Sequence, residues 1–388
     1  MRTQNTVAID MPGFSHQLET PRRRREVQIS PSSGIINSIS IPRCGNSQIT
    51  EQDNMQALTL KQTKSPLELL ERSDPEPQAD EVVVQLVAAA LNRRDYWITQ
   101  GMYPGIELPV VLGSDGAGIV VQTGSHVDPS WKNREVIIDP ALNWGNSPSV
   151  QSEQFTILGL PHDGTFATHV VIAASQLHVK PKHLNWHEAA ALPLAGVTAY
   201  RALFSQGGLQ SGETVLITGI GGGVATFALQ FAVAAGADVW VTSSSPEKIQ
   251  RAIELGAKGG FNYGEEDWHR KLVKSAGNPD LIIDSAGGPG YSALLTIAAP
   301  GGRIVNYGAT AGPPEKIDLF KVFWKQLRLQ GSTMGSPRDF QQMLSFVEKH
   351  KIRPVIDRVF PLSEGNEAIR MMKVSPQFGK YVLSIDQD

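Results

Sequence analysis

The sequence predicts an α/β protein in which a β-rich domain is combined with a doubly wound parallel sheet. Residues 55 to 187 contain short β-branched runs bounded by turn residues, the pattern of half-buried strands. From residue 214 to residue 330, strands and helices alternate, which is typical of a parallel sheet covered by helices. The 388 residues are also enough for two domains, at roughly 150 residues per domain.

Composition and charge narrow the class of protein. With 41% hydrophobic and 19% charged residues, the chain can build cores and lacks the signature of a disordered protein. A net charge of −3 attracts neither nucleic acid nor an anionic membrane. The longest apolar runs are interrupted well before about 20 residues, so we expect no membrane span. One cysteine, Cys44, excludes an internal disulfide and suits a reducing, cytoplasmic setting.

The first 50 residues differ from the rest. Pro12, Pro21, Pro31 and Pro42 interrupt any periodicity, and the basic run 22–25 stands alone. These features predict a disordered, solvated tail. The excess of Arg and Ser over acids also suits a mitochondrial presequence, although the spaced prolines argue against an amphipathic helix.

The remaining elements follow in order. Strands are expected at 81–88, 118–121, 135–139 and 167–173 of the β-rich part. The alternating part has expected strands at 214–218, 239–242, 261–263, 281–284, 303–307 and 327–330, with helices at 224–235 and 246–255. A helix at 339–350 and a strand at 381–385 complete the first domain. We therefore predict a tail (1–50), a β-rich catalytic domain in two parts (51–188 and 333–388), and a nucleotide-binding domain between them (189–332).

The strongest local signal is a glycine-rich turn between an apolar strand and an apolar helix. Residues 219–225 read GIGGGVA. A bound pyrophosphate needs backbone N–H groups at a helix start and no Cβ in its way, and glycine provides both. Gly219, Gly222 and Ala225 are spaced by three, which departs from G-x-G-x-x-G. We predict that Gly219, Gly222, Gly223 and Val224 bind a dinucleotide; a glycine turn without a ligand is the alternative.

The nucleotide type is predicted from the end of the second strand of this domain. Asp238 precedes that strand, so it lies at the wrong end to bind a ribose hydroxyl. Ser243, Ser244 and the nearby Lys248 follow the strand and suit a 2′-phosphate, which favours NADP(H) over NAD(H). The alternative is a Ser-Pro helix start with a solvated lysine.

Four stretches give the chain a resemblance to the medium-chain dehydrogenase/reductase superfamily, specifically its zinc-independent, quinone-oxidoreductase-like and enoyl-reductase-like members. They are ALNRRDYWITQGMYP from Ala90, LPVVLGSDGAGIV from Leu108, LPLAGVTAYRAL from Leu192, and the GIGGGVA turn with its helix. The resemblance implies a GroES-like catalytic domain split around a Rossmann domain, with the active site in the cleft between them.

The residues at the expected zinc positions predict that no metal binds. Zinc-dependent relatives carry a cysteine ligand in the first stretch and Gly-His-Glu in the second. This chain has Asn92 to Asp95 in the first and Gly113-Ser114-Asp115 in the second, and the lobe around residues 142–159 has no cysteine. His183 and His187 stand four residues apart but lack a third ligand, so a structural role is favoured.

Without a Lewis acid, hydride delivery to an electron-poor alkene or quinone is easier than alcohol oxidation, because the conjugated carbonyl spreads the developing charge. One proton donor or oxyanion partner then suffices. By resemblance to enoyl reductases, Tyr103 in Gln100-Gly101-Met102-Tyr103 is the candidate; lining the pocket is its alternative role. Asn92, in an Asn-x-x-Asp pattern, is a candidate for the nicotinamide ribose or the substrate oxygen, and Asp95 for a helix cap or an arginine partner.

Three further residues are candidate cofactor contacts. Thr198 is expected near the nicotinamide by resemblance, or else bonded to its own helix backbone. Tyr263 and Gly308 end the third and fifth strands of the nucleotide-binding domain, where Tyr263 can cover the adenosine 2′-phosphate and Gly308 can let the backbone approach the nicotinamide.

These observations predict an NADPH-dependent oxidoreductase that reduces quinones or α,β-unsaturated carbonyls without metal. A metal-free alcohol dehydrogenase is the alternative enzyme. An NADPH-binding protein without essential turnover is the alternative of another class. We expect a small-molecule substrate and a homodimer, with no nucleic-acid or membrane partner, and leave the substrate itself open.

Overall fold

The computed structural model describes residues 54–374 and 377–385, all of which fall in one compact unit. The predicted tail, residues 1–50, lies outside the described residues. Two large sheets organise the described chain: a mostly antiparallel seven-stranded sheet and a six-stranded sheet in which every pairing is parallel.

The seven-stranded sheet forms the centre of the catalytic domain. Its strand order is β10-β6-β5-β3-β18-β17, and β9 also pairs with β3. Valines and other apolar residues of β3 pack with apolar residues of neighbouring strands. They form a buried core that includes Leu58, Leu86, Val120 and Phe166. The strands are β3 (Glu81–Ala90), β5 (Asp115–Thr123), β6 (Glu135–Ile138), β9 (His169–Ala173), β10 (Leu177–Val179), β17 (Ile356–Pro361) and β18 (Lys380–Ser384).

Smaller sheets flank this one. The first is three-stranded in the order β2-β1-β4, and the second pairs β7 with β8 in the lobe around residues 142–159. Their bounds are β1 (Met55–Leu60), β2 (Glu68–Arg72), β4 (Val110–Val111), β7 (Ala141–Leu142) and β8 (Thr156–Ile157).

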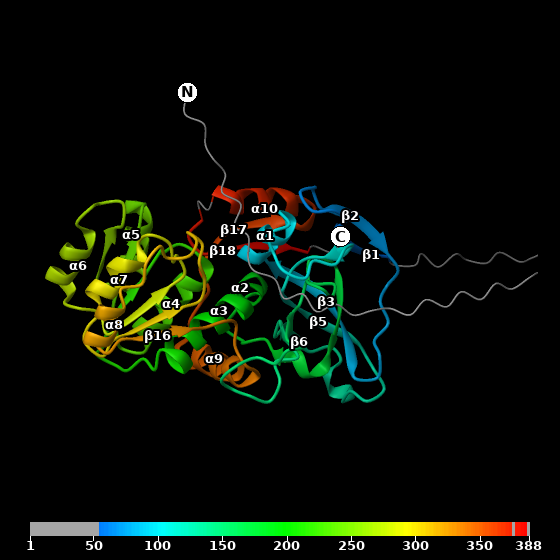
Figure 1. Ribbon diagram of the computed structural model, residues 1–388. Coiled ribbons are helices and arrows are strands. Elements are labelled where there is room, and N and C mark those ends of the chain that lie inside the picture. The colour runs from blue at the N-terminus through cyan, green and yellow to red at the C-terminus, as the bar shows by residue number, and fades with distance from the viewer. Residues whose placement is uncertain (1–53, 375–376, 386–388) are drawn as a thin grey trace, which may run out of the picture. The chain divides into compact units, whose positions relative to one another are not determined.

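The chain returns to the catalytic domain after the parallel sheet, as predicted. Strand β18, near the end of the chain, pairs antiparallel with β3, with Leu383 opposite Ala89. Figure 1 shows these C-terminal strands in red beside the blue and cyan elements of the first third of the chain. The GroES-like domain is therefore split around the Rossmann domain, which confirms the predicted fold class.

The parallel sheet has the strand order β13-β12-β11-β14-β15-β16, so the order reverses between β11 and β14. Alternate residues of its central strands face two different cores: Val215 and Ile217 face one, and Leu216 and Ile282 the other. Burial on both faces explains why these strands read as continuous apolar runs. The strands are β11 (Thr214–Ile217), β12 (Asp238–Ser243), β13 (Gly259–Asn262), β14 (Leu281–Asp284), β15 (Arg303–Asn306) and β16 (Arg328–Gly331).

Helices connect the parallel strands and link the two domains (Figure 1). The connecting helices are α4 (Gly223–Ala234), α5 (Pro246–Glu254), α6 (Trp268–Ala276), α7 (Tyr291–Ile297) and α8 (Leu319–Trp324). The others are α1 (Arg93–Thr99), α2 (Trp186–Ala191), α3 (Pro193–Tyr200), which continues into a π-helical segment η3 (Arg201–Gln206), α9 (Pro337–His350) and α10 (Gly365–Val374). Short 3₁₀ turns are η1 (Pro129–Trp131), η2 (Ala174–Gln176) and η4 (Leu362–Glu364).

Every strand and helix expected from the sequence within the described range is present, with ends shifted by a few residues. The sequence analysis missed the strands β1, β2, β4, β7, β8, β10 and β17 and the helices α6, α7, α8 and α10. The exact domain boundaries stay a prediction. Within the described residues, no helix is long and apolar enough to cross a membrane.

Candidate active site

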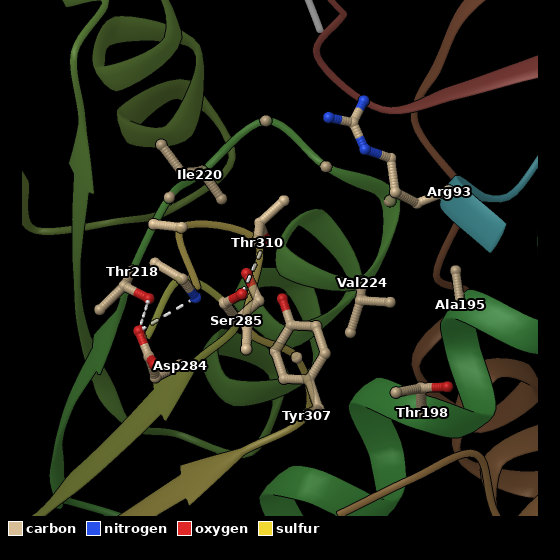
Figure 2. Close-up of a pocket in the computed structure, with 18 of the residues that line it drawn as sticks. Arg93, Ala195, Thr198, Thr218, Ile220, Val224, Asp284, Ser285, Tyr307 and Thr310 are labelled. Atoms are coloured by element: carbon tan, nitrogen blue, oxygen red, sulfur yellow. Dashed lines mark hydrogen bonds between the residues drawn. The ribbon is translucent and has the colours of Figure 1, made fainter. Parts of the chain in front are cut away.

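A cavity of about 1020 Å³ lies at the reversal point of the parallel sheet and is also lined by the catalytic domain. Its size is at the upper end of the range for small-molecule sites, roughly 300–1,000 Å³. Figure 2 shows strand-end residues such as Thr218, Asp284 and Tyr307 with Arg93 and Thr198 from other elements. The residues predicted for catalysis or cofactor binding all line this cavity: Asn92, Tyr103, Thr198, Gly219, Gly222, Gly223, Val224, Ser243, Ser244, Lys248, Tyr263 and Gly308.

The glycine turn leaves open space at the start of α4. Gly219 has φ +63°, a left-handed conformation that favours glycine, and a Cβ added there or at Gly222 would meet no atom within 4 Å. Gly222 is the N-cap of α4, and no side chain caps the helix. The first N–H groups of a long helix therefore adjoin an unfilled space, which fits an anionic phosphate.

Cations surround this turn. A Cβ added to Gly223 would stand 2.6 Å from Cδ of Lys380, and one added to Gly221 would stand 2.9 Å from Cδ of Lys248. Arg93 lines the cavity, lies 5.2 Å from the Trp97 ring and donates a hydrogen bond to the Met372 carbonyl. Burial lowers the pKa of both Arg93 and Lys248. The cluster is well placed to neutralise a pyrophosphate.

The outer end of the cavity holds the residues predicted for the adenosine side. Ser243 ends β12, and the Tyr263 hydroxyl donates to Ser244 Oγ at 3.1 Å. Ser245 caps α5 by accepting from Lys248 N at 3.2 Å, so the Ser-Pro helix start is present together with the cavity-lining serines. Asp238 begins β12, at the opposite end of the strand, and lies 3.4 Å from Lys258 Nζ.

Asp284 organises the central wall of the cavity. Its buried carboxylate accepts from the Thr218 hydroxyl at 2.6 Å and from Gly287 N at 2.9 Å, and Asn306 Nδ2 donates to it at 2.8 Å. The Thr310 hydroxyl donates to the Ser285 carbonyl at 2.7 Å. Figure 2 draws this hydrogen bond and the one between Thr218 and Asp284. These bonds fix the loops that follow β14 and β15, including Gly308.

A buried polar cluster joins the end of β3 and the start of β5 to the start of the last strand, β18. Lys380 Nζ donates to Asn92 Oδ1 at 2.7 Å and to Asp115 Oδ2 at 2.9 Å. Asn92 Nδ2 also donates to Asp115 at 2.8 Å, and Leu194 N donates to its other oxygen at 2.8 Å. The Asn92 amide is therefore bonded through both its oxygen and its nitrogen, which restricts its freedom to bind a ligand.

Asp95 has the structural role that the sequence favoured. Its Oδ2 accepts from Asn92 N at 2.7 Å and completes the cap of α1. The side chain is fully buried, and burial raises its pKa to about 6 against the lowering effect of Arg94. Thr198 likewise donates to the Leu194 carbonyl at 2.7 Å, so it combines a backbone bond with a place in the cavity wall.

Tyr103 and Arg94 lie together in the cavity. The Arg94 guanidinium carbon is 5.0 Å from the centre of the Tyr103 ring, and its Nε is 3.4 Å from the tyrosine oxygen. Arg94 Nη1 donates to Ser114 Oγ at 2.7 Å and to the Leu158 carbonyl at 2.8 Å.

Sequence reasoning gave no site role to Arg93, Arg94 or Lys380. The two arginines lie in the stretch ALNRRDYWITQGMYP, which served only to show that the cysteine ligand of zinc-dependent relatives is missing there. Lys380 is 265 residues from Asp115 and has no motif of its own, so only the fold brings it to the site.

Comparison with known proteins then identifies the family. Residues 78–182 match the alcohol dehydrogenase GroES-like domain, and residues 223–349 match the zinc-binding dehydrogenase family. The chain is 38% identical to the zinc-type alcohol dehydrogenase-like protein YogA of Leptosphaeria maculans, over 84% of this chain and 99% of that protein. This chain belongs to the medium-chain dehydrogenase/reductase superfamily. It is an oxidoreductase with a site for a nicotinamide cofactor.

Solved structures of this superfamily point to two types of chemistry. A crystal structure of an NAD-dependent alcohol dehydrogenase has a TM-score of 0.81 and 35% identity, covering 85% of this chain and 100% of that one. A 2-octenoyl-CoA carboxylase reductase in complex with NADP and 2-octenoyl-CoA has a TM-score of 0.78 and 27% identity, covering 87% and 89%.

The zinc named in the family descriptions does not fit this dehydrogenase/reductase. Ser114 stands where zinc-dependent relatives have a histidine, and it bonds to the guanidinium of Arg94, a fixed positive charge. No group of three His, Cys, Asp or Glu side chains suited to a metal occurs in the described part of the chain. His183 and His187 bond separately, to the Ile352 carbonyl and to Ser384 Oγ.

Proposed function

We propose that this protein is an NADPH-dependent reductase of quinones or α,β-unsaturated carbonyls. The observation that carries the proposal is one cavity that joins an open, glycine-lined helix start to a donor pair, Tyr103 and Arg94, in the catalytic domain. A dinucleotide on the glycine turn directs its other end toward that pair, because the catalytic domain lines the same cavity.

The glycine turn and Arg93 hold the pyrophosphate, since they combine helix N–H groups with a cation that lines the same cavity. Ser243, Ser244 and Lys248 bind the 2′-phosphate, with Tyr263 covering it. Asp238, whose carboxylate would favour an unphosphorylated ribose, lies at the far end of β12 and pairs with Lys258. These contacts favour NADPH over NADH.

Bound NADPH supplies a hydride. The chain itself has to orient the acceptor, exclude water and donate a hydrogen bond to the oxygen on which negative charge develops. We assign the last task to Tyr103, because this residue lines the cavity and its phenol hydroxyl can donate to a developing oxyanion. Thr198 and the loop at Gly308 form the wall expected beside the nicotinamide.

A panel of substrates tests the proposal. Purified protein is mixed with NADPH and, separately, an α,β-unsaturated ketone, an enoyl-CoA thioester and a quinone, and nucleotide oxidation is followed. We expect turnover of at least one acceptor. NADPH binding without turnover of any acceptor would instead support a nucleotide-binding protein.

Alcohol oxidation is the second candidate, because a structure at 35% identity is an NAD-dependent alcohol dehydrogenase. The same panel therefore includes primary and secondary alcohols with NAD⁺ and NADP⁺. Efficient alcohol oxidation with no reduction of unsaturated carbonyls or quinones would replace the proposed function.

We also propose that the protein is a homodimer joined through the edge of the parallel sheet. Strand β16 is the edge strand and is exposed along its length, and the adjacent helix α8 exposes Leu319, Phe320, Phe323 and Trp324. An unpaired edge beside exposed aromatics suits pairing with a second copy. Light scattering is expected to give a dimer that Phe323→Lys dissociates; a parent monomer would contradict this.

The proposed compartment is the cytoplasm, because a single cysteine suits a reducing environment. The arginine-rich first residues make a mitochondrial location the alternative. Microscopy of the full chain tagged at its C-terminus distinguishes them.

A further inference from the structure

Arg94 is a buried cation whose bonding leaves one edge of its guanidinium available. It is 8% exposed and lines the cavity. Nη1 donates to Ser114 Oγ and to the Leu158 carbonyl, and Nε faces the Tyr103 hydroxyl at 3.4 Å. Within residues 54–374 and 377–385, the two N–H groups of Nη2 make no hydrogen bond, and a guanidinium can only donate.

The charge of Arg94 also has no bonded counter-charge. Among the described residues, no carboxylate forms an ion pair with it. Asp115 is taken by Lys380 at 2.9 Å, and Asp95 directs Oδ2 to Asn92 N. The Asp95 carboxyl is near enough for Arg94 to lower its pKa against the effect of burial, but it forms no ion pair with Arg94. A buried charge without a bonded counter-charge is costly, and an anionic group that enters the cavity would offset this cost.

The position of this cation is informative. Ser114 stands at the histidine position of zinc-dependent relatives, and Arg94 belongs to the stretch that carries their cysteine. The guanidinium therefore bridges the two stretches that would otherwise meet at the metal. Unlike a metal, it is covalently fixed, permanently charged and held in one orientation by Ser114, Leu158 and the Tyr103 ring.

We propose that Arg94 is a catalytic residue that replaces the Lewis acid, with Nη2 donating to the carbonyl oxygen of an unsaturated carbonyl substrate. This rests on the proposed reductase function. The hydride from NADPH forms a C–H bond at the β-carbon, the alkene π electrons shift onto the carbonyl oxygen, and NADP⁺ is left. The enolate oxygen lies against Arg94 until a proton from solvent water is added at the α-carbon, hydroxide is released to the solvent and the C=O bond re-forms. A preorganised donor of this kind acts where charge develops.

Two variants test this assignment. Arg94→Gln removes the charge, and Arg94→Lys keeps it but loses the planar fork. We expect Arg94→Gln to slow single-turnover reduction of an enone by about a hundredfold to a thousandfold, the range for losing an oxyanion donor, with NADPH affinity unchanged. Arg94→Lys should fall between Arg94→Gln and the parent. The matched control is Arg134→Gln, an arginine outside the cavity that also stacks on an aromatic ring and bonds a backbone carbonyl; it should keep the parental rate.

A binding measurement separates this inference from the proposed function. Butyrate, a saturated carboxylate, imitates the enolate charge and needs no turnover. Calorimetric titration into the protein saturated with NADP⁺ should show binding that Arg94→Gln weakens at least tenfold. Butyrate binding in a protein that reduces no unsaturated carbonyl and no quinone would refute the proposed function while leaving the anion site intact.

Folding of each variant is checked by circular dichroism. If Arg94→Gln does not fold, Arg94→Lys carries the test, and a loss of at least about tenfold in hydride-transfer rate is expected. A folded Arg94→Gln or Arg94→Lys protein that reduces enones at the parental rate overturns the assignment. So does butyrate affinity that is unchanged by both substitutions.

Discussion

Replacing Lys380 by Met should destabilise the protein far more than an equivalent change on the surface. Lys380 is 4% exposed and Asp115 is fully buried, so the variant would leave a carboxylate without its cation inside the protein. Asp115 would keep only the Asn92 and Leu194 donors. Removing one partner of a buried ion pair costs about 3–5 kcal/mol, and we expect the free energy of unfolding to fall by that amount.

The assay is urea unfolding of the parent, Lys380→Met, Asp115→Asn and the double variant. The double variant should recover part of the loss, because no uncompensated charge remains buried. Lys61→Met is the matched control: its ion pair with Glu68 has nearly the same length, 2.8 Å, but both side chains are about half exposed, and the change should have little effect. If Lys380→Met and Lys61→Met are equally mild, the buried cluster does not join the strands as described.

Three further predictions concern catalysis, pH and metal. Tyr103→Phe should lower the single-turnover hydride-transfer rate for an enone by about tenfold to a thousandfold, with NADPH affinity unchanged and quinones less affected; a parental rate would make Tyr103 a wall of the pocket. Burial raises the pKa of Asp139 to about 7, above the value of about 3.9 for an unfolded chain, so charging it destabilises the fold increasingly as pH rises from about 4 to 7. Asp139→Asn keeps an acceptor for Ala141 N and should therefore be a few kcal/mol more stable than the parent at pH 8 and no more stable at pH 4, as measured by urea unfolding at both pH values; equal differences at the two pH values would contradict this. Protein prepared in excess zinc and desalted should carry well under one equivalent of zinc by elemental analysis and should keep its activity with chelators. Stoichiometric zinc would show that the residues at the zinc positions do bind the metal.

The sequence predicted most of the fold because its signals were local. The apolar strand before Gly219 and the helix after it identified the phosphate-binding turn, and buried parallel strands appeared as continuous apolar runs. Strand β2 was missed because none of its five residues is buried and three are charged, so it lacks an alternating apolar pattern. Helix α6 was missed because it is short and its few apolar residues are separated by basic ones, so no clear helical period is visible.

The sequence led to cavity-lining residues where a residue follows a strand or belongs to a motif. Ser243, Tyr263 and Gly308 were chosen from strand ends, and the fold brings them to one cavity. The sequence did not lead to Lys380, whose partners Asn92 and Asp115 are 288 and 265 residues away. Arg94 could not be distinguished from a surface arginine until its bonds to Ser114 and Leu158 were known.

The central claim is that this site reduces unsaturated carbonyls or quinones with NADPH. The most direct measurement is kcat/KM for reduction of the best acceptor of the panel with NADPH and with NADH. One charge-assisted contact to the 2′-phosphate should give NADPH at least about a tenfold advantage, which corresponds to about 1.4 kcal/mol. Equal values for the two nucleotides, or a preference for NADH, would contradict the account.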